Sequence, residues 1–401
     1  MRVLLSTIGS RGDVQPLAAV AVQLRALGHA ARVCAPPNFG EWIEGLGIPF
    51  VPIGPDVRST AKQSGAPRPE QIRAMMDGTV ATQFATIPTA AEGCDVIVGA
   101  NPLQIAARSV AEHMSIPYVF AAYCPVSLPS PHHAPPRVPA WTPLNPTAGN
   151  LAIWTEDAER WNERWSIALN SQRAAIGLSP VSDVRDHILT DAPWLAADRT
   201  LAPWFEPSDL DVFQTGAWIL PDDRPLSTEI EAFLDAGDAP IYFGLGSVRA
   251  PEDVSIALIA AARSLGRRVM MSRGWADLSL VDDQPDCLSI GDVNQQRLFS
   301  RVAAVVHHGG AGTTTAATRS GAPQLVMPQH YDQHYFAQRV DELGIGSAHA
   351  CVAPTTQSLS DALDQVLHPN VAVRARSIAT KVSTDGALIA AQRLIEVRGK
   401  G

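Results

Sequence analysis

The segment VVHHGGAGTTT, residues 305–315, combines residue types that suit the binding of a phosphate. Two histidines and three glycines stand between an apolar run and a run that favours a helix. Glycines let the backbone approach a ligand, and the free N–H groups and dipole at a helix start attract negative charge. We therefore expect an anion site here, with a histidine and the hydroxyl of Thr313 or Thr314 as further donors. An ordinary tight turn is the alternative.

Two common nucleotide-binding motifs do not fit this segment. It is not a GxGxxG sequence after the first strand, which disfavours a nicotinamide dehydrogenase, and it is not the GxxxxGK[ST] sequence of P-loop ATPases. The segment also stands late in the chain. In a two-domain α/β protein, this position indicates a nucleotide held by the C-terminal domain and a second substrate held by the N-terminal one.

Alternating strand and helix patterns must position this loop. An apolar run at Val3 to Leu5 leads into a glycine-bearing loop, and VQPLAAVAVQLRALGH then has apolar residues at helical spacing until Gly28. The pattern restarts at PIYFGLGS in the second half. Such alternation predicts parallel sheets covered on both faces. We predict an α/β protein with two facing doubly wound, Rossmann-like domains that bind ligands beyond the carboxyl ends of their strands.

A cluster of proline and aspartate, PDDRPLS, indicates a domain boundary near the middle of the chain. We expect an N-terminal domain over 1–205, a linker over 206–224, a C-terminal domain over 225–383, and a last helix over 384–401 that packs back on the N-terminal domain. Residues 124–150 are too rich in proline for a helix or an inner strand. Their apolar and aromatic content favours a loop that packs over a substrate, and a loose surface excursion is the alternative.

Composition excludes several other classes of protein. The formal net charge of -9 and the lack of Lys or Arg runs argue against a nucleic-acid partner. No apolar run reaches the ~18–20 residues of a membrane span, and the N-terminus turns polar too early for a signal peptide, so we expect a cytoplasmic protein. The five cysteines are widely spaced, which disfavours both a disulfide framework and a zinc site.

Several segments together resemble one family, the inverting GT-B glycosyltransferases of the large nucleotide-sugar-dependent family 1. The bacterial branch that glycosylates glycopeptide antibiotics of the vancomycin group is most similar. The segments are SRGDVQPL, PWLAAD, QTGAWILPDDRPLS, GWADL, HHGGAGTT, PQHYDQHYFAQRV and LGIG. This resemblance implies a hexosyltransferase that moves a sugar from UDP- or dTDP-sugar to a hydroxyl of a hydrophobic or glycopeptide aglycone. It implies no cofactor beyond the nucleotide sugar and no metal.

The resemblance also assigns donor-binding residues in the C-terminal domain. The diphosphate is expected at His308, Gly310, Gly312 and Thr313, the sugar hydroxyls at Asp332 and Gln333, the nucleotide at Ser247 and Trp275, and the base at Val293. The residue types suit the sugar, since a carboxylate accepts hydrogen bonds from hydroxyls while an amide both gives and takes them. An exposed helix start with Asp332 near its N-cap is the alternative.

Asp13, in GSRGD, is the candidate catalytic base. Glycosyl transfer needs a group that takes the proton of the acceptor hydroxyl, and Ser10 is expected to orient Asp13 or to contact the phosphate. Plant and macrolide relatives carry histidine at the matching position. A helix N-terminus should lower the pKa of Asp13 below the usual ~3.9, unless burial by the acceptor raises it. A helix-capping role for Asp13 is the alternative, and both roles are compatible.

Other functions remain open at this point. A sterol, steroid or polyphenol glucosyltransferase shares the GSRGDVQPL segment. A nucleotide-sugar 2-epimerase has the same two-domain architecture without a second-substrate groove, which the proline-rich loop disfavours. A non-catalytic metabolite binder is disfavoured because Asp13, His308, Asp332 and Gln333 are all present.

Overall fold

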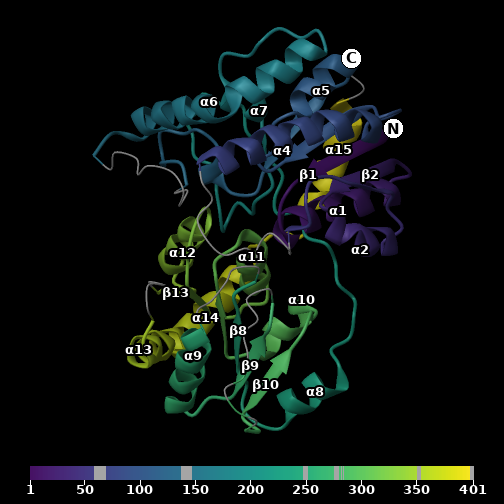
Figure 1. Ribbon diagram of the computed structural model, residues 1–401. Coiled ribbons are helices and arrows are strands. Elements are labelled where there is room, and N and C mark those ends of the chain that lie inside the picture. The colour runs from purple at the N-terminus through teal and green to yellow at the C-terminus, as the bar shows by residue number, and fades with distance from the viewer. Residues whose placement is uncertain are drawn as a thin grey trace.

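The computed structural model describes residues 1–57, 69–136, 147–246, 252–274, 280, 282, 284–349 and 354–397. The chain forms two α/β halves, one above the other in Figure 1, and each is built around one parallel sheet. The predicted fold class is therefore confirmed. Among the described residues, no helix is both long enough and apolar enough to cross a membrane.

The N-terminal half contains a seven-stranded sheet in the order β3-β2-β1-β4-β5-β6-β7. Its strands are β1 (Arg2–Thr7), β2 (Ala30–Ala35), β3 (Phe50–Pro52), β4 (Val96–Ala100), β5 (Tyr118–Ala122), β6 (Trp194–Leu195) and β7 (Phe213–Gln214). The strand order reverses between β1 and β4. In a doubly wound sheet, the loops after two such strands diverge to opposite faces and leave a crevice for ligands.

Helices cover both faces of this sheet. They are α1 (Arg11–Ala26), α2 (Gly40–Gly45), α4 (Pro69–Ala90), α5 (Ala107–Met114), α6 (Asn150–Ala175) and α7 (Val184–Leu189), with short 3-10 turns at Pro37–Phe39 and Pro125–Ser127. Val3 and Leu5 of β1 pack with α1 on one face. Leu4 packs with α4 and α5 on the other. Both faces of β1 are thus buried, which explains its continuous apolar run.

The C-terminal half contains a six-stranded sheet in the order β10-β9-β8-β11-β12-β13, with its reversal between β8 and β11. Its strands are β8 (Ile241–Gly244), β9 (Val269–Ser272), β10 (Cys287–Ile290), β11 (Ala304–His307), β12 (Gln324–Val326) and β13 (Gly346–Ala348). Its helices are α8 (Thr228–Asp235), α9 (Glu252–Ser264), α10 (Gln295–Leu298), α11 (Ala311–Arg319), α12 (Gln333–Glu342), α13 (Thr356–Val366), α14 (Pro369–Ala379) and α15 (Gly386–Val397), with a 3-10 turn at Phe299–Arg301.

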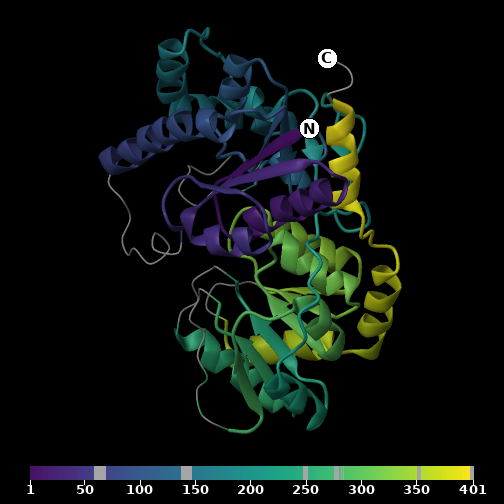
Figure 2. The same ribbon diagram turned by 90° about the vertical axis from the view of Figure 1, so that its right-hand side faces the viewer.

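The last helix, α15, crosses back to the N-terminal half. Figure 2 shows α15 in yellow beside that half, and Ala387, Ala390 and Leu394 share an apolar cluster with Leu17 of α1. Conversely, Phe336 of α12, in the C-terminal half, packs into an apolar cluster of the N-terminal half. The limits 1–205, 206–224, 225–383 and 384–401 stay predictions, because sheet order alone does not define where a folding unit ends.

The crossing depends on a close backbone contact at Gly386. A Cβ atom there would lie 2.5 Å from the carbonyl oxygen of Ala217 and 2.5 Å from the carbonyl carbon of Gly216. We expect Gly386→Ala to lower the free energy of unfolding by about 1–3 kcal/mol through overpacking. Gly78→Ala is the control, because that glycine lies in α4 with no atom within 4 Å of an added Cβ. It should stabilise by about 0.5–1 kcal/mol. Equal responses in urea unfolding would contradict the prediction.

Candidate active site

The candidate site lies where the two sheets present the carboxyl ends of their central strands. Ser10 and Asp13 follow β1, and His308 to Thr313 follow β11, so both loops start at a reversal of strand order. The charge of Asp13 contributes to the raised pKa of Asp332, after burial as the main cause. The two carboxyl groups, from different halves of the chain, are therefore close enough to interact.

The two adjacent histidines have different roles. His307 is fully buried, its Nε2 lies 3.0 Å from the Oε1 of Gln324, and its Nδ1 accepts the N–H of Gly309 at 3.1 Å. An Nδ1 that accepts is unprotonated, so Nε2 carries the proton and donates it to Gln324. Burial lowers the pKa of His307 to about 3. His307 thus holds the glycine loop in shape.

His308 lies between two stretches of glycine backbone. A Cβ atom at Gly246 would lie 2.7 Å from its Cε1, and one at Gly310 would lie 2.5 Å from its Nε2. Its Nδ1 is buried without a hydrogen-bond partner in the described part of the chain. Burial, followed by the charge of His330, lowers the pKa of the ring to about 4. His308 is therefore neutral near pH 7 and is available to a ligand through an N–H group, not through a positive charge.

The start of α11 offers unpaired donors beside His308. Gly310 precedes the helix in an extended conformation, and the N–H of Thr314 makes the first intrahelical bond, to the Gly310 carbonyl at 3.0 Å. The preceding N–H groups are those that a helix start leaves without an internal partner, and among them that of Ala311 is directed at the Asp332 carboxyl. The Thr314 hydroxyl donates to the Gly310 carbonyl at 2.9 Å, whereas the Thr313 hydroxyl makes no hydrogen bond to any described residue. Of the two threonines, Thr313 is thus the one available to a phosphate. Gly312 is exposed on the same turn.

Asp332 and Gln333 lie at the start of α12, next to this loop. Asp332 precedes the helix, but its side chain makes no capping hydrogen bond, which does not support the simple capping alternative. Burial, and then Asp13, raise its pKa to about 7, while the N–H of Ala311 opposes that rise. The Oε1 of Gln333 accepts the N–H of Gln329 at 2.8 Å and that of His330 at 3.3 Å. The expectation that this amide both gives and takes is therefore corrected, because its oxygen is occupied and only its NH₂ group is available to a sugar.

Asp13 lies in the first turn of α1 with hydrogen bonds to both carboxylate oxygens. Its Oδ2 accepts the N–H of Ser10 at 2.8 Å and the Ser10 hydroxyl at 3.3 Å, and its Oδ1 accepts the Nδ2 of Asn101 at 2.9 Å. Ser10 is the N-cap residue, so Asp13 does take part in helix capping. Burial raises the pKa of Asp13 despite these donors. The expectation that the pKa would fall below its usual value is wrong, since desolvation outweighs the hydrogen bonds from Asn101 and Ser10.

Three further positions, Ser247, Trp275 and Val293, are predicted to line the nucleotide pocket. Val293 follows β10 and is partly buried against a cluster that contains Leu298 and Phe299. Ser247 and Trp275 lie outside the described residues. Across the described ranges, no group of three or more His, Cys, Asp or Glu side chains is arranged to hold a metal ion.

The proline-rich loop packs firmly where it is described, over 124–136 and 147–150. Cys124 and Leu128 share an apolar cluster with Trp165 of α6 and Phe336 of α12. The ring of His133 lies 6.1 Å from that of Trp154 and 5.9 Å from that of Trp204. This part of the loop is therefore no loose surface excursion, and it brings aromatic side chains to the boundary between the halves.

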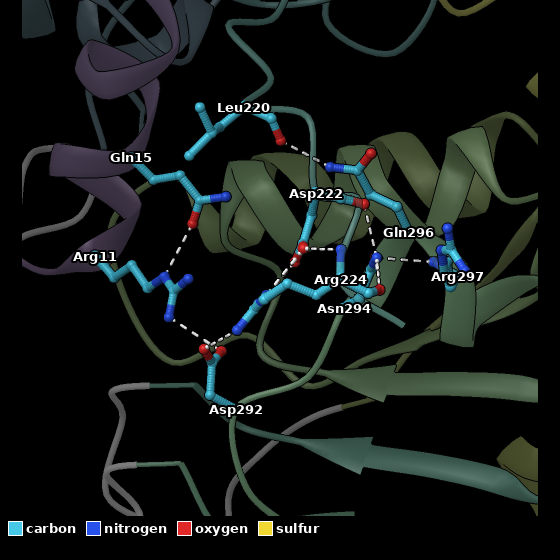
Figure 3. A network of polar contacts seen from close by, with 9 residues as sticks. All are labelled: Arg11, Gln15, Leu220, Asp222, Arg224, Asp292, Asn294, Gln296 and Arg297. Atoms are coloured by element: carbon cyan, nitrogen blue, oxygen red, sulfur yellow. Dashed lines mark hydrogen bonds and ion pairs between the residues drawn. The ribbon is translucent and has the colours of Figure 1, made fainter. Parts of the chain in front are cut away.

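A polar network joins the first loop to the loop after β10 and to the segment between β7 and α8 (Figure 3). Asp292 accepts from Arg11 at 3.0 Å and from Arg224 at 2.9 Å, one bond to each carboxylate oxygen. Asn294 adds two bonds from its Nδ2 to the carbonyls of Asp222 and Arg224, at 2.7 and 2.8 Å. The start of α1 is thus tied to the loop that carries Val293. The positions of these residues in the sequence do not predict that they pair.

Comparisons with known proteins agree with this geometry. Residues 3–129 match the glycosyltransferase family 28 N-terminal domain, and residues 258–388 match the erythromycin biosynthesis protein CIII-like C-terminal domain. The chain is 53% identical to glycosyltransferase GtfE of Amycolatopsis orientalis, over 100% of this chain and 98% of that one. It is 50% identical to the vancomycin aglycone glucosyltransferase of the same organism, over 99% of this chain and 97% of that one.

A solved structure of glycosyltransferase VinC in complex with dTDP has the same fold, with a TM-score of 0.69, 20% identity and coverage of 100% of both chains. The fold and the site thus define a two-domain transferase of GT-B architecture, as the sequence predicted. The chain belongs to the glycosyltransferase family that these relatives represent, and it is a glycosyltransferase.

The two histidines give the first prediction for this site. His308→Ala should weaken binding of UDP or dTDP about 10- to 100-fold, because it removes a hydrogen bond to a charged group, and should leave the unfolding free energy nearly unchanged. His307→Ala should instead destabilise the protein by about 1–3 kcal/mol, because it leaves buried partners unsatisfied. Calorimetric titration and urea unfolding measure the two effects. Equal loss of stability in both variants would contradict the division of roles.

Asp332 gives a prediction on pH. Its folded-state pKa of about 7 lies above the unshifted 3.8, so the folded state binds the extra proton between these values. Stability from the protonated carboxyl is fully present below about pH 4 and is lost as the pH rises through about 7. As the pH rises from about 5 to about 8, the wild type loses this stability and Asp332→Asn does not. The difference in unfolding free energy should therefore shift in favour of Asp332→Asn by on the order of 2 kcal/mol.

Urea unfolding at both pH values measures this difference. Asp361→Asn, at an exposed position of α13, is the control and should show no such change. A pH-independent difference between Asp332→Asn and wild type would contradict the prediction.

Proposed function

We propose that this glycosyltransferase moves a hexose from a UDP- or dTDP-sugar to a hydroxyl of a glycopeptide aglycone, with inversion at the anomeric carbon. The observation that carries the proposal is the placement of Asp13 and Asp332 around one space beside the start of α11. This placement combines a base for the acceptor, a partner for the sugar hydroxyls and a phosphate site. The aglycone class is supported by the 50% identity to the vancomycin aglycone glucosyltransferase, over 99% of this chain and 97% of that one.

Each donor-site residue has a role that follows from its surroundings. The N–H groups at the start of α11, the ring of His308 and the Thr313 hydroxyl hold the diphosphate, with Gly310 and Gly312 allowing its close approach. Asp332 accepts hydrogen bonds from the sugar hydroxyls, and the NH₂ group of Gln333 donates one. Val293, after β10, lies on the nucleotide side, and the roles of Ser247 and Trp275 stay predictions from the resemblance.

The reaction follows from this arrangement. The acceptor oxygen forms a bond to the anomeric carbon while the bond from that carbon to the diphosphate oxygen breaks on the opposite face. The electron pair leaves with the nucleoside diphosphate, where the helix dipole and N–H groups of α11 stabilise the developing charge. Asp13 takes the acceptor proton. Its raised pKa makes it a stronger base than a free aspartate.

The acceptor side is supported by the aromatic cluster at the boundary of the halves. The indole Nε1 atoms of Trp165 and Trp204 are buried without a hydrogen-bond partner in the described structure. The hydroxyl of Tyr335 is also buried without a partner there. These residues belong to or pack against the cluster that includes Leu128 of the proline-rich loop. Because these polar atoms are buried, the cluster holds the proline-rich loop in place beside the acceptor and does not itself contact the aglycone.

The test compares wild type and Asp13→Asn with UDP-glucose and dTDP-glucose, a vancomycin-type aglycone and a sterol. Wild type should add one hexose to the aglycone, read by mass spectrometry. Asp13→Asn should lose about 10²- to 10⁴-fold in kcat while binding nucleotide normally, because the amide cannot take a proton. Transfer to the sterol alone would refute the aglycone class. Equal transfer by both enzymes would refute the base.

A further inference from the structure

Asn101 occupies a position that brings it directly against Asp13. It follows β4, which pairs in parallel with β1 so that Thr7 lies opposite Ala100. The Thr7 hydroxyl donates to the Ala100 carbonyl at 3.0 Å, and this hydrogen bond links the two strands at their carboxyl ends. The loops that leave these strands therefore start side by side, although Asn101 and Asp13 are separated by 88 positions in sequence.

Every polar group of Asn101 has a defined partner. Its N–H donates to the Ala121 carbonyl at 3.4 Å, and its carbonyl accepts the N–H of Gln104 at 3.1 Å. Its side-chain Oδ1 accepts the N–H of Leu103 at 2.9 Å, which fixes the orientation of the amide. The Nδ2 must then point to the Oδ1 of Asp13, 2.9 Å away.

The backbone at Asn101 shows that this geometry is imposed by its surroundings. Its φ is 76°, in the left-handed region that asparagine tolerates better than most residues. Gln83 of α4 supports the loop from behind, since its Nε2 donates to the Leu103 carbonyl at 2.8 Å and its Oε1 accepts the N–H of Ala106 at 2.9 Å. Non-glycine residues held in this region concentrate at functional sites.

The hydrogen bonds on Asp13 distinguish its two oxygens. Oδ2 accepts two bonds, from the N–H and the hydroxyl of Ser10, whereas Oδ1 accepts one, from Asn101. A carboxylate oxygen has two lone pairs, so Oδ1 keeps one position open. We propose that Asn101 is a positioning residue for glycosyl transfer, which holds the Oδ1 of Asp13 as the atom that receives the acceptor proton.

This inference rests on the proposed role of Asp13 as the base. A donor on the ionised carboxylate favours that form, so Asn101 opposes the rise that burial causes in the pKa of Asp13. Among the described residues, the titratable groups that interact with the charge of Asp13 are Tyr123, Tyr331 and Asp332. The pKa values of both tyrosines are raised, so they stay neutral. The pKa of Asp332 is about 7, so its titration can also move the acidic limb of the pH profile, and the experiment needs a control for it.

The experiment measures the pH profile of kcat/KM for wild type, Asn101→Gly and Asn101→Asp. Glycine fits the backbone conformation and removes the donor, so the acidic limb should move up by about one pH unit. Because the carboxylate is then no longer held in place, kcat on the pH-independent plateau should fall about tenfold. Asn101→Asp should move the limb further, because two adjacent carboxylates resist ionising together. Nucleotide affinity should stay within about twofold of wild type, since no donor contact is removed.

Two controls separate this effect from others. Ser115→Gly changes a residue with a φ of 55° at the end of α5, outside the site, and should keep the wild-type profile. Repeating the series in an Asp332→Asn background removes the titration of Asp332, and the shift caused by Asn101→Gly should persist there. A shift that vanishes in this background would overturn the inference, as would an acidic limb unchanged by Asn101→Gly.

Hydrolysis of the nucleotide sugar distinguishes this inference from the proposed function. Water replaces the aglycone in that reaction, and the same base takes its proton. If the aglycone gains no hexose while hydrolysis shows the shifted limb, the acceptor class fails and the role of Asn101 stands. If hydrolysis shows the same limb in wild type and Asn101→Gly, the role of Asn101 fails whatever the acceptor is.

Discussion

The parallel pairing of β1 with β4, and of β8 with β11, is the constraint on which the candidate site depends. Adjacent parallel strands end at the same edge of a sheet, so the loops after them start together. Asp13 and Asn101 meet at one such edge, and the start of α11 lies at the other. The hydrogen bond from Arg11, at the start of α1, to Asp292, after β10, joins the two edges.

Burial at this boundary then sets the chemistry of the groups placed there. It raises the pKa of Asp13 and Asp332 and lowers that of His307 and His308. All four groups are thus shifted toward their neutral forms, as desolvation requires. A phosphate would meet neutral N–H and O–H donors and a helix dipole rather than a cationic side chain, and Ser10 and Asn101 limit the rise at Asp13.

The relative placement of the two halves depends on contacts far apart in sequence. The packing of α15 on α1 buries apolar surface, whereas the ion pairs of Asp292 with Arg11 and Arg224 are largely exposed. Exposed pairs contribute little to stability, about 0–1 kcal/mol each. Their value is geometric, because they join the residue next to Ser10 to the residue next to Val293.

The sequence by itself determined the alternation of strands and helices, the glycine turn after β11 and the two doubly wound sheets, because helical spacing, buried strands and glycine turns are local properties of the chain. Only the tertiary structure decided that His307 is held by Gln324 and Gly309, that Thr314 is occupied by the backbone, and that the pKa of Asp13 rises. Each depends on neighbours from other elements and on the exclusion of water. Asn101 shows the same limit, because its contact with Asp13 spans 88 positions and exists only once β4 pairs with β1.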